Sequence, residues 1–350
     1  MMHKKKIFLE FLRIISIILV LFNHTGRQGF FLYMGYQGSS YYWIYMFISL
    51  ACKVAVPTFW MISGALLIDK EESFSTIFKK RFLRMLLVLV VFSVFQYFYN
   101  CTLYDYKPSI LTFFKIFYTS EHASAYWFLY NYLSMLILLP LIRKAVKSLS
   151  NKELIYGFFI SLLFRGIIPI VQYVIDKDLV ITNNLYEFMF PLNLTYFVGG
   201  YYFEKRVDKL SLKKSIIWFF VGIFGILVSC LMTHYQYLVT GVIDEEISQT
   251  FYNSLIVLPT FSMFYITKYI FTKIKVYNVF EKLILDFGGA AFGVMLVENI
   301  LRATFIPLYY RFFSYSHPLG ACIIWILCSW FCGSLIVILI KKIPGVKKFI

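Results

Sequence analysis

The sequence predicts an all-α, polytopic integral membrane protein, a bundle of about ten transmembrane helices with both termini cytoplasmic. Two observations carry this prediction. The first is composition, because 60% of the 350 residues are hydrophobic, 15% are charged, and the mean hydropathy is +0.72. Soluble domains carry roughly 25% charged residues, so this lower charge and high hydrophobicity indicate a chain that lies within a lipid bilayer. The second is the alternation of basic and acidic connections between apolar segments, which follows the positive-inside rule.

Ten apolar segments satisfy both hydropathy and charge alternation. No linker or soluble appendage separates them, so we expect one membrane domain over residues 1–350. The first segment is too long for a signal-peptide core and no small-residue cleavage site follows it, so it is expected to be retained as a span. The predicted spans are Ile7–Thr25, Trp43–Ile68, Phe82–Cys101, Tyr126–Ile142, Leu154–Val174, Tyr186–Phe203, Ser215–Tyr237, Thr250–Phe271, Leu283–Leu308 and Leu319–Ile340.

The net charge of +16 has a topological explanation, because basic residues recur at every second connection. Acidic residues mark two of the other connections, at Asp176 with Asp178 and at residues 244–246, and these loops are expected outside. A nucleic-acid partner is therefore not expected. The six cysteines form no CxxC pair and have no histidine at ligand spacing, so neither a disulfide framework nor a metal site is predicted.

The first span contains two ionisable side chains, Arg13 and His24. Eleven residues are close to three helical turns, so both side chains share one face about 16 Å apart along the axis. Arginine is a permanent cation that binds anions, and histidine exchanges a proton near neutral pH. Ionisable groups inside a bilayer are costly, which makes this pair a candidate functional site. His24 could serve as general base, or it could be an interfacial histidine bonded to a neighbour.

The second and third spans add further cations. Lys53 lies part-way into the membrane on the side of His24, where it could line a cavity or snorkel to the interface. Pro57 and the Ser63-Gly64 pair predict a kink and a close helix contact. Arg81 and Arg84 open the third span, where they could anchor its cytoplasmic end or clamp a phosphorylated ligand together with Arg13.

The later spans hold three more charged candidates. Glu298 and Arg302 lie four residues apart on one face of the ninth span. This spacing is explained by an internal ion pair, which lowers the cost of burying both charges, and a catalytic role is the alternative. Arg165 in the fifth span is a further candidate for a polar cavity, although the sequence names no partner for it.

Taken together, several motifs resemble the membrane acyltransferase-3 family over most of the chain. The most specific is Arg13, ten residues, then His24 in the first span. The others, in order, are Pro57-Thr58-Phe59-Trp60-Met61-Ile62-Ser63-Gly64, Lys79-Lys80-Arg81-Phe82-Leu83-Arg84, Trp127-Phe128-Leu129 followed by Pro140-Leu141-Ile142, and Phe197-Val198-Gly199-Gly200-Tyr201.

Two positions depart from the family pattern. The family often carries arginine before the second-helix proline, and this chain has Lys53, which keeps the charge without the planar fork. The family often reads Gly-Ile-Tyr-Leu-Ile-His near its C-terminus. This chain has Glu298 at the histidine position, so the role of that histidine does not carry over.

The resemblance implies an O-acyltransferase that moves an acyl group, usually acetyl, from cytosolic acyl-CoA to a hydroxyl of a surface polysaccharide or its lipid-linked precursor. It implies His24 and Arg13 as catalytic residues, Arg81 and Arg84 as donor-binding residues, and a bacterial cytoplasmic membrane. The cavity or substrate-orienting residues expected are Lys53, Ser63, Trp127, Arg165, Glu298 and Arg302. Partners are acyl-CoA, the glycan and membrane lipid, with no cofactor expected and a second copy of the chain left open. A transporter or flippase of a glycan intermediate is the rival class, because intramembrane charges line such paths too.

Overall fold

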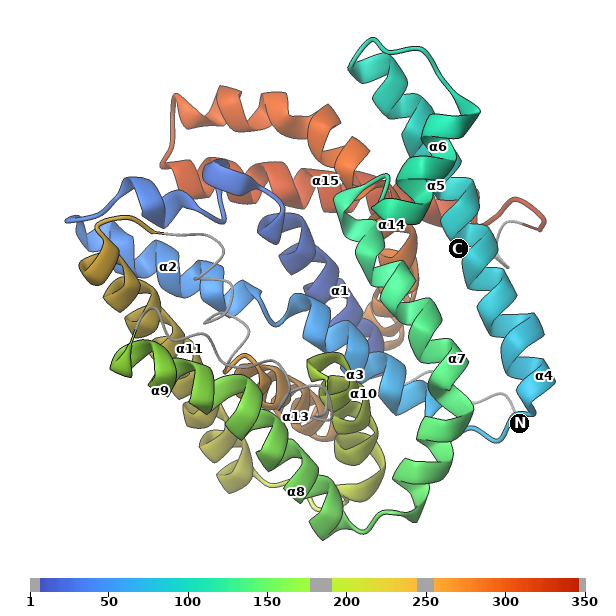
Figure 1. The fold of residues 1–350 in the computed structure, drawn as a ribbon, viewed down its shortest axis with the longest axis vertical. Coiled ribbons are helices and arrows are strands. Elements are labelled where there is room, and N and C mark those ends of the chain that lie inside the picture. The colour runs from blue at the N-terminus through green and yellow to red at the C-terminus, as the bar shows by residue number, and fades with distance from the viewer. Residues whose placement is uncertain (1–6, 177–190, 244–254, 346–350) are drawn as a thin grey trace.

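The computed structural model describes residues 7–176, 191–243 and 255–345 (Figure 1). Helices connected by turns and loops make up this part of the chain, and no strand occurs in it. The helices are α1 (Ile7–Asn23), α2 (Ser40–Cys52), α3 (Ala55–Leu67), α4 (Phe74–Ile77), α5 (Leu83–Leu103), α6 (Ile110–Thr119), α7 (Trp127–Ser148), α8 (Asn151–Leu162), α9 (Ile168–Ile175), α10 (Leu192–Tyr201), α11 (Leu212–Thr240), α13 (Val257–Lys273), α14 (Asn278–Phe313) and α15 (Pro318–Ile340).

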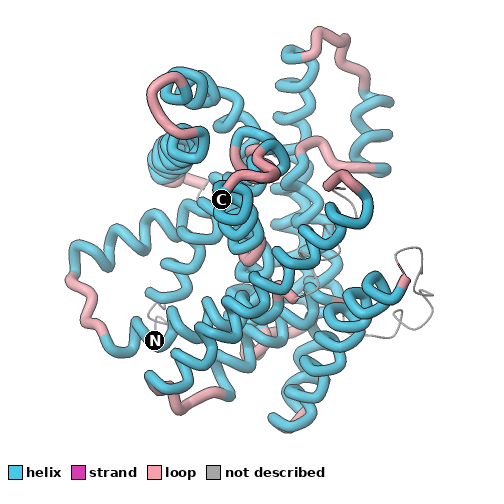
Figure 2. The backbone as a smooth tube through the Cα atoms, turned by 90° about the vertical axis from the view of Figure 1, so that its left-hand side faces the viewer, coloured by secondary structure: helices cyan, strands magenta, loops and turns pink. Residues whose placement is uncertain are grey.

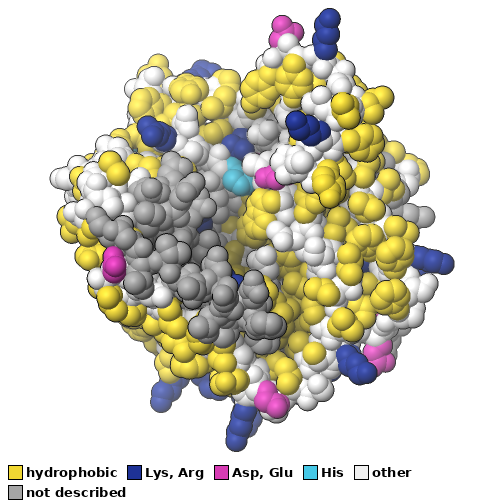
Figure 3. Space-filling model, viewed as in Figure 1, with side chains coloured by type: hydrophobic (Ala, Val, Ile, Leu, Met, Phe, Trp, Pro, Cys, Tyr) yellow, Lys and Arg dark blue, Asp and Glu magenta, His cyan; other side chains and the backbone are white. Residues whose placement is uncertain are grey.

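The predicted all-α, membrane-spanning fold is confirmed. Seven helical segments within the described residues are long and apolar enough to cross a membrane. α1 and α13, with 17 residues each, and α10, with 10, are shorter. Each of the ten predicted spans overlaps a helix, although residues 186–190 of the sixth and 250–254 of the eighth lie outside the described residues. Large hydrophobic side chains are exposed along these helices, as a lipid-facing surface requires (Figure 3).

The second predicted span is two helices rather than one. α2 ends at Cys52 and α3 begins at Ala55, so the break falls at Lys53 and Val54. Pro57 explains the break, because it has no N–H for the carbonyl of Lys53 and its ring clashes with that carbonyl. The kink expected at Pro57 is therefore confirmed, and Lys53 lies at the discontinuity. The short apolar helix α6 was not predicted.

Two glycine motifs bring α3 and α10 into backbone contact. A Cβ added to Gly64 would lie 1.7 Å from the carbonyl oxygen of Phe197, and one added to Gly200 would lie 1.9 Å from that of Met61. No side chain larger than hydrogen fits at either position without moving a helix. The close contact expected at Ser63-Gly64 is confirmed, and the glycine pair after Phe197 completes it.

Several basic connections meet at one end of the bundle. Arg143 of α7 donates to the carbonyl of Leu67 at the end of α3 (2.9 Å) and to the carboxylate of Glu72 (2.8 Å). Arg81 donates to the same carboxylate with two nitrogens, at 2.9 and 2.5 Å. Figure 2 shows the loops that connect the ends of the helices. That this end is cytoplasmic stays a prediction.

Candidate functional site

Two polar cavities lie one behind the other between the central helices. The outer cavity, of about 430 Å³, lies at the end of α1 and is lined by Val20, Asn23, His24, Lys53, Val56, Pro57, Phe59, Ala125, Trp127, Phe128, Leu192, Asn193, Tyr196 and Met295. The inner cavity, of about 270 Å³, is lined by Arg13, Phe59, Ile62, Ser63, Arg84, Met85, Phe128, Tyr132, Gly288, Gly289, Phe292, Met295 and Lys341. Phe59, Phe128 and Met295 line both, so these three side chains separate the cavities.

His24 lines the outer cavity directly after the end of α1. Its N–H bonds to the carbonyl of Val20 at 3.2 Å, and the neighbouring Asn23 donates its amide to the carbonyl of Cys52 at 3.2 Å. In a continuous helix that carbonyl would accept from the N–H of Val56. The break before Pro57 thus releases an acceptor that fixes the end of α1 beside the cavity.

The imidazole of His24 lies against a buried carboxylate. Nδ1 of His24 is 3.1 Å from Oε1 of Glu298, whose side chain is only 1% exposed. Arg302 donates Nε to the other oxygen of Glu298 at 2.6 Å. The i,i+4 ion pair predicted for the ninth span is therefore present, and its carboxylate also contacts the candidate base. A carboxylate at Nδ1 leaves Nε2 as the nitrogen that exchanges a proton with a substrate.

Arg302 of α14 connects the contact between His24 and Glu298 to α1 and α15. Its Nη1 donates to the backbone carbonyl of His24 at 2.5 Å, so one guanidinium holds both the carboxylate and the backbone of the histidine. The indole of Trp325 in α15 donates to the carbonyl of Arg302 at 3.0 Å. Nearby, the hydroxyl of Tyr126 donates to the carbonyl of Leu296 at 2.7 Å and fixes the start of α7 on α14. The site is built on rigid elements rather than on a loop.

Three cations from three elements line the inner cavity: Arg13 from α1, Arg84 from α5 and Lys341 after α15. Arg13 donates to Glu10 of its own helix at 2.7 Å. Their i,i+3 spacing is one that brings two side chains together on a helix. Lys341 donates to the carbonyl of Gly289. Such a group of cations around a cavity suits a polyanionic ligand.

Arg81 is not brought into this group. It does not line the inner cavity, and its guanidinium is bonded to the loop carboxylate of Glu72. Hydrogen bonds from Arg81, with help from Arg143, hold the pKa of Glu72 at about 2 against the opposing effect of burial. Arg81 thus contacts the loop after α3, and of the three predicted arginines only Arg13 and Arg84 line the inner cavity.

The remaining predicted residues divide between the cavities. Lys53 and Trp127 line the outer cavity, and the ammonium of Lys53 lies 4.5 Å from the ring centre of Phe30. Ser63 lines the inner one. Arg165 lies half-buried in the π-helical turn between α8 and α9 and lines neither.

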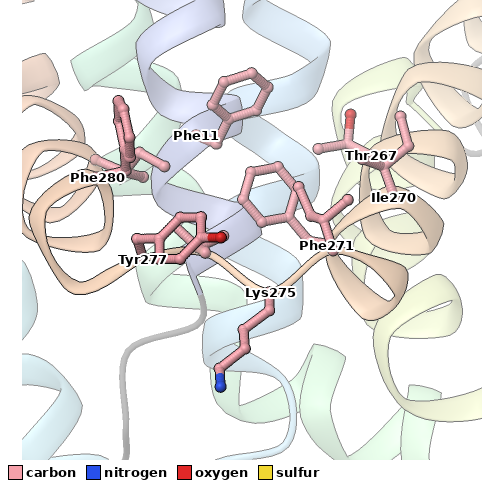
Figure 4. A pocket seen from close by; sticks show the side chains of 10 residues that line it. Phe11, Thr267, Ile270, Phe271, Lys275, Tyr277 and Phe280 are labelled. Atoms are coloured by element: carbon pink, nitrogen blue, oxygen red, sulfur yellow. The ribbon is translucent and has the colours of Figure 1, made fainter.

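A third pocket, of about 410 Å³, has a different character. It lies between α1, α13 and the start of α14, and rings of Phe11, Phe271 and Phe280 surround it (Figure 4). The ammonium group of Lys275 points away from these rings (Figure 4). No acid or base chemistry follows from it. Among the described residues no three His, Cys, Asp or Glu side chains are grouped to hold a metal ion.

Residues 6–341 match the family described as an acyltransferase domain, which is almost the whole chain. The chain belongs to the acyltransferase-3 family. It is therefore an acyltransferase and, with its long apolar helices, a multi-pass membrane protein. No curated protein and no solved structure matches the chain.

Two parts of the site could not be predicted from the sequence. The contact between His24 and Glu298 joins residues that are far apart in the chain, and a single sequence carries no signal for it. In the sequence, Lys341 resembles any other cytoplasmic anchor after a last span. Only the packing of α14 on α15 brings it to the inner cavity.

Proposed function

We propose that this protein transfers an acyl group, acetyl in the first instance, from cytosolic acyl-CoA to a hydroxyl of a surface polysaccharide or its lipid-linked precursor. The reaction takes place across a bacterial cytoplasmic membrane. One observation carries the proposal: a histidine in the outer cavity, backed by a buried carboxylate, lies one constriction away from a cavity lined by three cations.

Acyl-CoA enters from the inner end. Its phosphates suit the cations of Arg13, Arg84 and Lys341, because guanidinium and ammonium groups bind phosphate oxygens with charge-assisted hydrogen bonds. The slender pantetheine arm then passes between Phe59, Phe128 and Met295, which brings the thioester into the outer cavity. Arg13 thus binds the phosphate end of acyl-CoA, and His24, on the same face of the first span, acts at its thioester end.

The acceptor hydroxyl reacts beside His24. Its oxygen forms a bond to the thioester carbon while Nε2 of His24 takes the proton, and the carbonyl electron pair moves to oxygen. The carbon–sulfur bond then breaks, the CoA thiolate leaves and takes the proton from His24, and an ester remains on the glycan. Glu298, whose Oε1 lies 3.1 Å from Nδ1, stabilises the imidazolium during this cycle.

The rival is a transporter of a glycan intermediate, for which the same charged groups could line a path. Membership of an acyltransferase family favours acyl transfer. The test is the mass of purified surface glycan from cells that express the wild-type chain, the His24→Ala variant at matched membrane level, or neither. We expect an acetyl-sized difference only with the wild type. Glycan of unchanged mass, with loss of surface glycan or accumulation of precursor when the chain is absent, would support the transporter instead.

A further inference from the structure

Tyr196 of α10 is a buried tyrosine at the wall of the outer cavity. Its side chain lines the same cavity as His24, and the residue is only 3% exposed. Among the described residues, this hydroxyl has no hydrogen-bond partner. A buried polar group without a partner destabilises the folded state, and native structures avoid it unless the group has another use.

The position of Tyr196 is set by backbone packing. The next residue, Phe197, places its carbonyl against Gly64 of α3, and Gly200 of α10 lies against Met61. α10 therefore cannot rotate or shift without a clash. Leu192, Asn193 and Tyr196 are spaced to share one helix face, and all three line the cavity.

Three other side chains near the cavity already have partners. The amide of Asn23 bonds to the carbonyl of Cys52, and the ammonium of Lys53 lies over the ring of Phe30. Arg302 is bonded to Glu298 and to the backbone of His24. The indole N–H of Trp60 is also without a partner in the described part of the chain, but Trp60 does not line either cavity.

We infer that the Tyr196 hydroxyl donates a hydrogen bond to the acyl carbonyl oxygen as that oxygen becomes an oxyanion. This inference rests on the proposed acyl transfer and adds a catalytic residue to it. When the acceptor oxygen bonds to the thioester carbon and His24 takes its proton, the carbonyl oxygen gains the electron pair. A hydrogen-bond donor that is already in position, in a site shielded from water, stabilises the negatively charged oxyanion more than it stabilises the neutral carbonyl oxygen. When the carbon–sulfur bond breaks, the carbonyl re-forms and the tyrosine keeps its proton throughout.

The inference predicts an unusual combination for Tyr196→Phe. The hydroxyl makes no hydrogen bond within the described protein, so its loss leaves the melting temperature unchanged or raises it. The turnover number for transfer of labelled acetyl from acetyl-CoA to purified glycan falls about 10²–10³-fold, which is typical for loss of one oxyanion donor. The KM values for acetyl-CoA and glycan stay close to those of the wild type, because the bond forms mainly in the transition state.

Tyr201→Phe is the matched control. Tyr201 lies on the same helix, is 4% exposed, and does not line either cavity; its ring packs under the guanidinium of Arg206. Loss of the Tyr201 hydroxyl should leave the turnover number near the wild-type value. All three proteins are compared as full-length chains in the same detergent or proteoliposome preparation.

Three results would overturn the inference. One is a Tyr196→Phe protein that turns over at the wild-type rate. Another is a raised KM for glycan with unchanged turnover, which makes the hydroxyl a ground-state contact to the sugar. A third is a lowered melting temperature, which makes it a structural group. The proposed function fails separately, if the wild-type protein itself transfers no acetyl group.

Discussion

Replacing Glu298 by glutamine tests the centre of the site, because one carboxylate contacts both Arg302 and His24. Its side chain is 1% exposed, Arg302 donates to it at 2.6 Å, and Nδ1 of His24 is 3.1 Å away. The substitution keeps the shape and removes the charge. It therefore leaves Arg302, whose side chain is only 14% exposed, without its counter-ion.

The structure separates two expected losses. Breaking a buried pair typically destabilises by about 3–5 kcal/mol, and the glutamine carbonyl still accepts one bond from Arg302, so we expect about 3 kcal/mol. The second loss is in rate, because the imidazolium of His24 loses its negative partner. General acid–base catalysis is worth about 10²–10⁴-fold, and we expect acyl transfer to fall by a factor in that range.

A double-mutant cycle with Arg302→Gln distinguishes the two. Folded yield is measured by size-exclusion chromatography in detergent, and activity as acetyl transferred per folded protein. Glu298→Gln with Arg302→Gln should recover yield, because no unpaired charge remains, yet stay far less active than Arg302→Gln alone. Arg302→Gln alone is the necessary reference, because it also removes the bond to the His24 carbonyl. Activity that returns together with yield in the double variant would refute the catalytic part of the reasoning and leave a purely structural pair.

Further predictions address the rest of the chain. His24→Ala should lower acyl transfer at least ~10²-fold while membrane insertion stays intact, and wild-type acylation at equal expression would make His24 a structural residue. Arg13→Lys should weaken binding of radiolabelled acyl-CoA because the guanidinium fork is lost, and Arg84→Lys should do the same; equal binding would leave both with a topological role. Glu72→Gln should lower the melting temperature in detergent at every pH from 5 to 8. In the wild type the contribution of Glu72, whose folded pKa is depressed to about 2, is complete above its unfolded pKa near ~4.3 and fades only as pH falls toward 2; a loss of stability already between pH 8 and 5 would contradict it. A cysteine placed beside Asp176 should react with an impermeant reagent on intact cells, and protection there, with labelling of the connections at the opposite end, would reverse the predicted topology.

The spans were predictable because they depend on local composition. Lipid-facing helices must be apolar along their length, so hydropathy and loop charge placed every predicted span on an observed helix, as far as the described residues reach. The Glu298–Arg302 pair was predictable for the same reason, since i,i+4 neighbours are fixed by the helix alone. The break before Pro57 also follows from a local rule.

The site itself depends on contacts between distant segments. Nothing near Arg81 in the third span indicates that Glu72 binds it, because the loop after α3 could have turned away. His24 and Glu298 meet only because α1 packs on α14, where Gly288 lets the two backbones approach. Tyr196 is one of 28 tyrosines, and only its place at the wall of the outer cavity, held by the contact of Gly64 with Phe197, distinguishes it from tyrosines at the membrane interfaces.

The constriction between the cavities bears on the choice between enzyme and transporter. The rings of Phe59 and Phe128 lie 6.3 Å apart, centre to centre, and Met295 completes the barrier. In the proposed reaction the thioester arm passes by rotation of these three side chains, since side chains change rotamer on fast timescales. The helices around the barrier are held together by the bond from Tyr126 to Leu296 and by the backbone contact of Gly288 with Glu10. A barrier made of movable side chains between fixed helices suits a reaction in which only the acyl group crosses, and it keeps water from the thioester until an acceptor hydroxyl is in place.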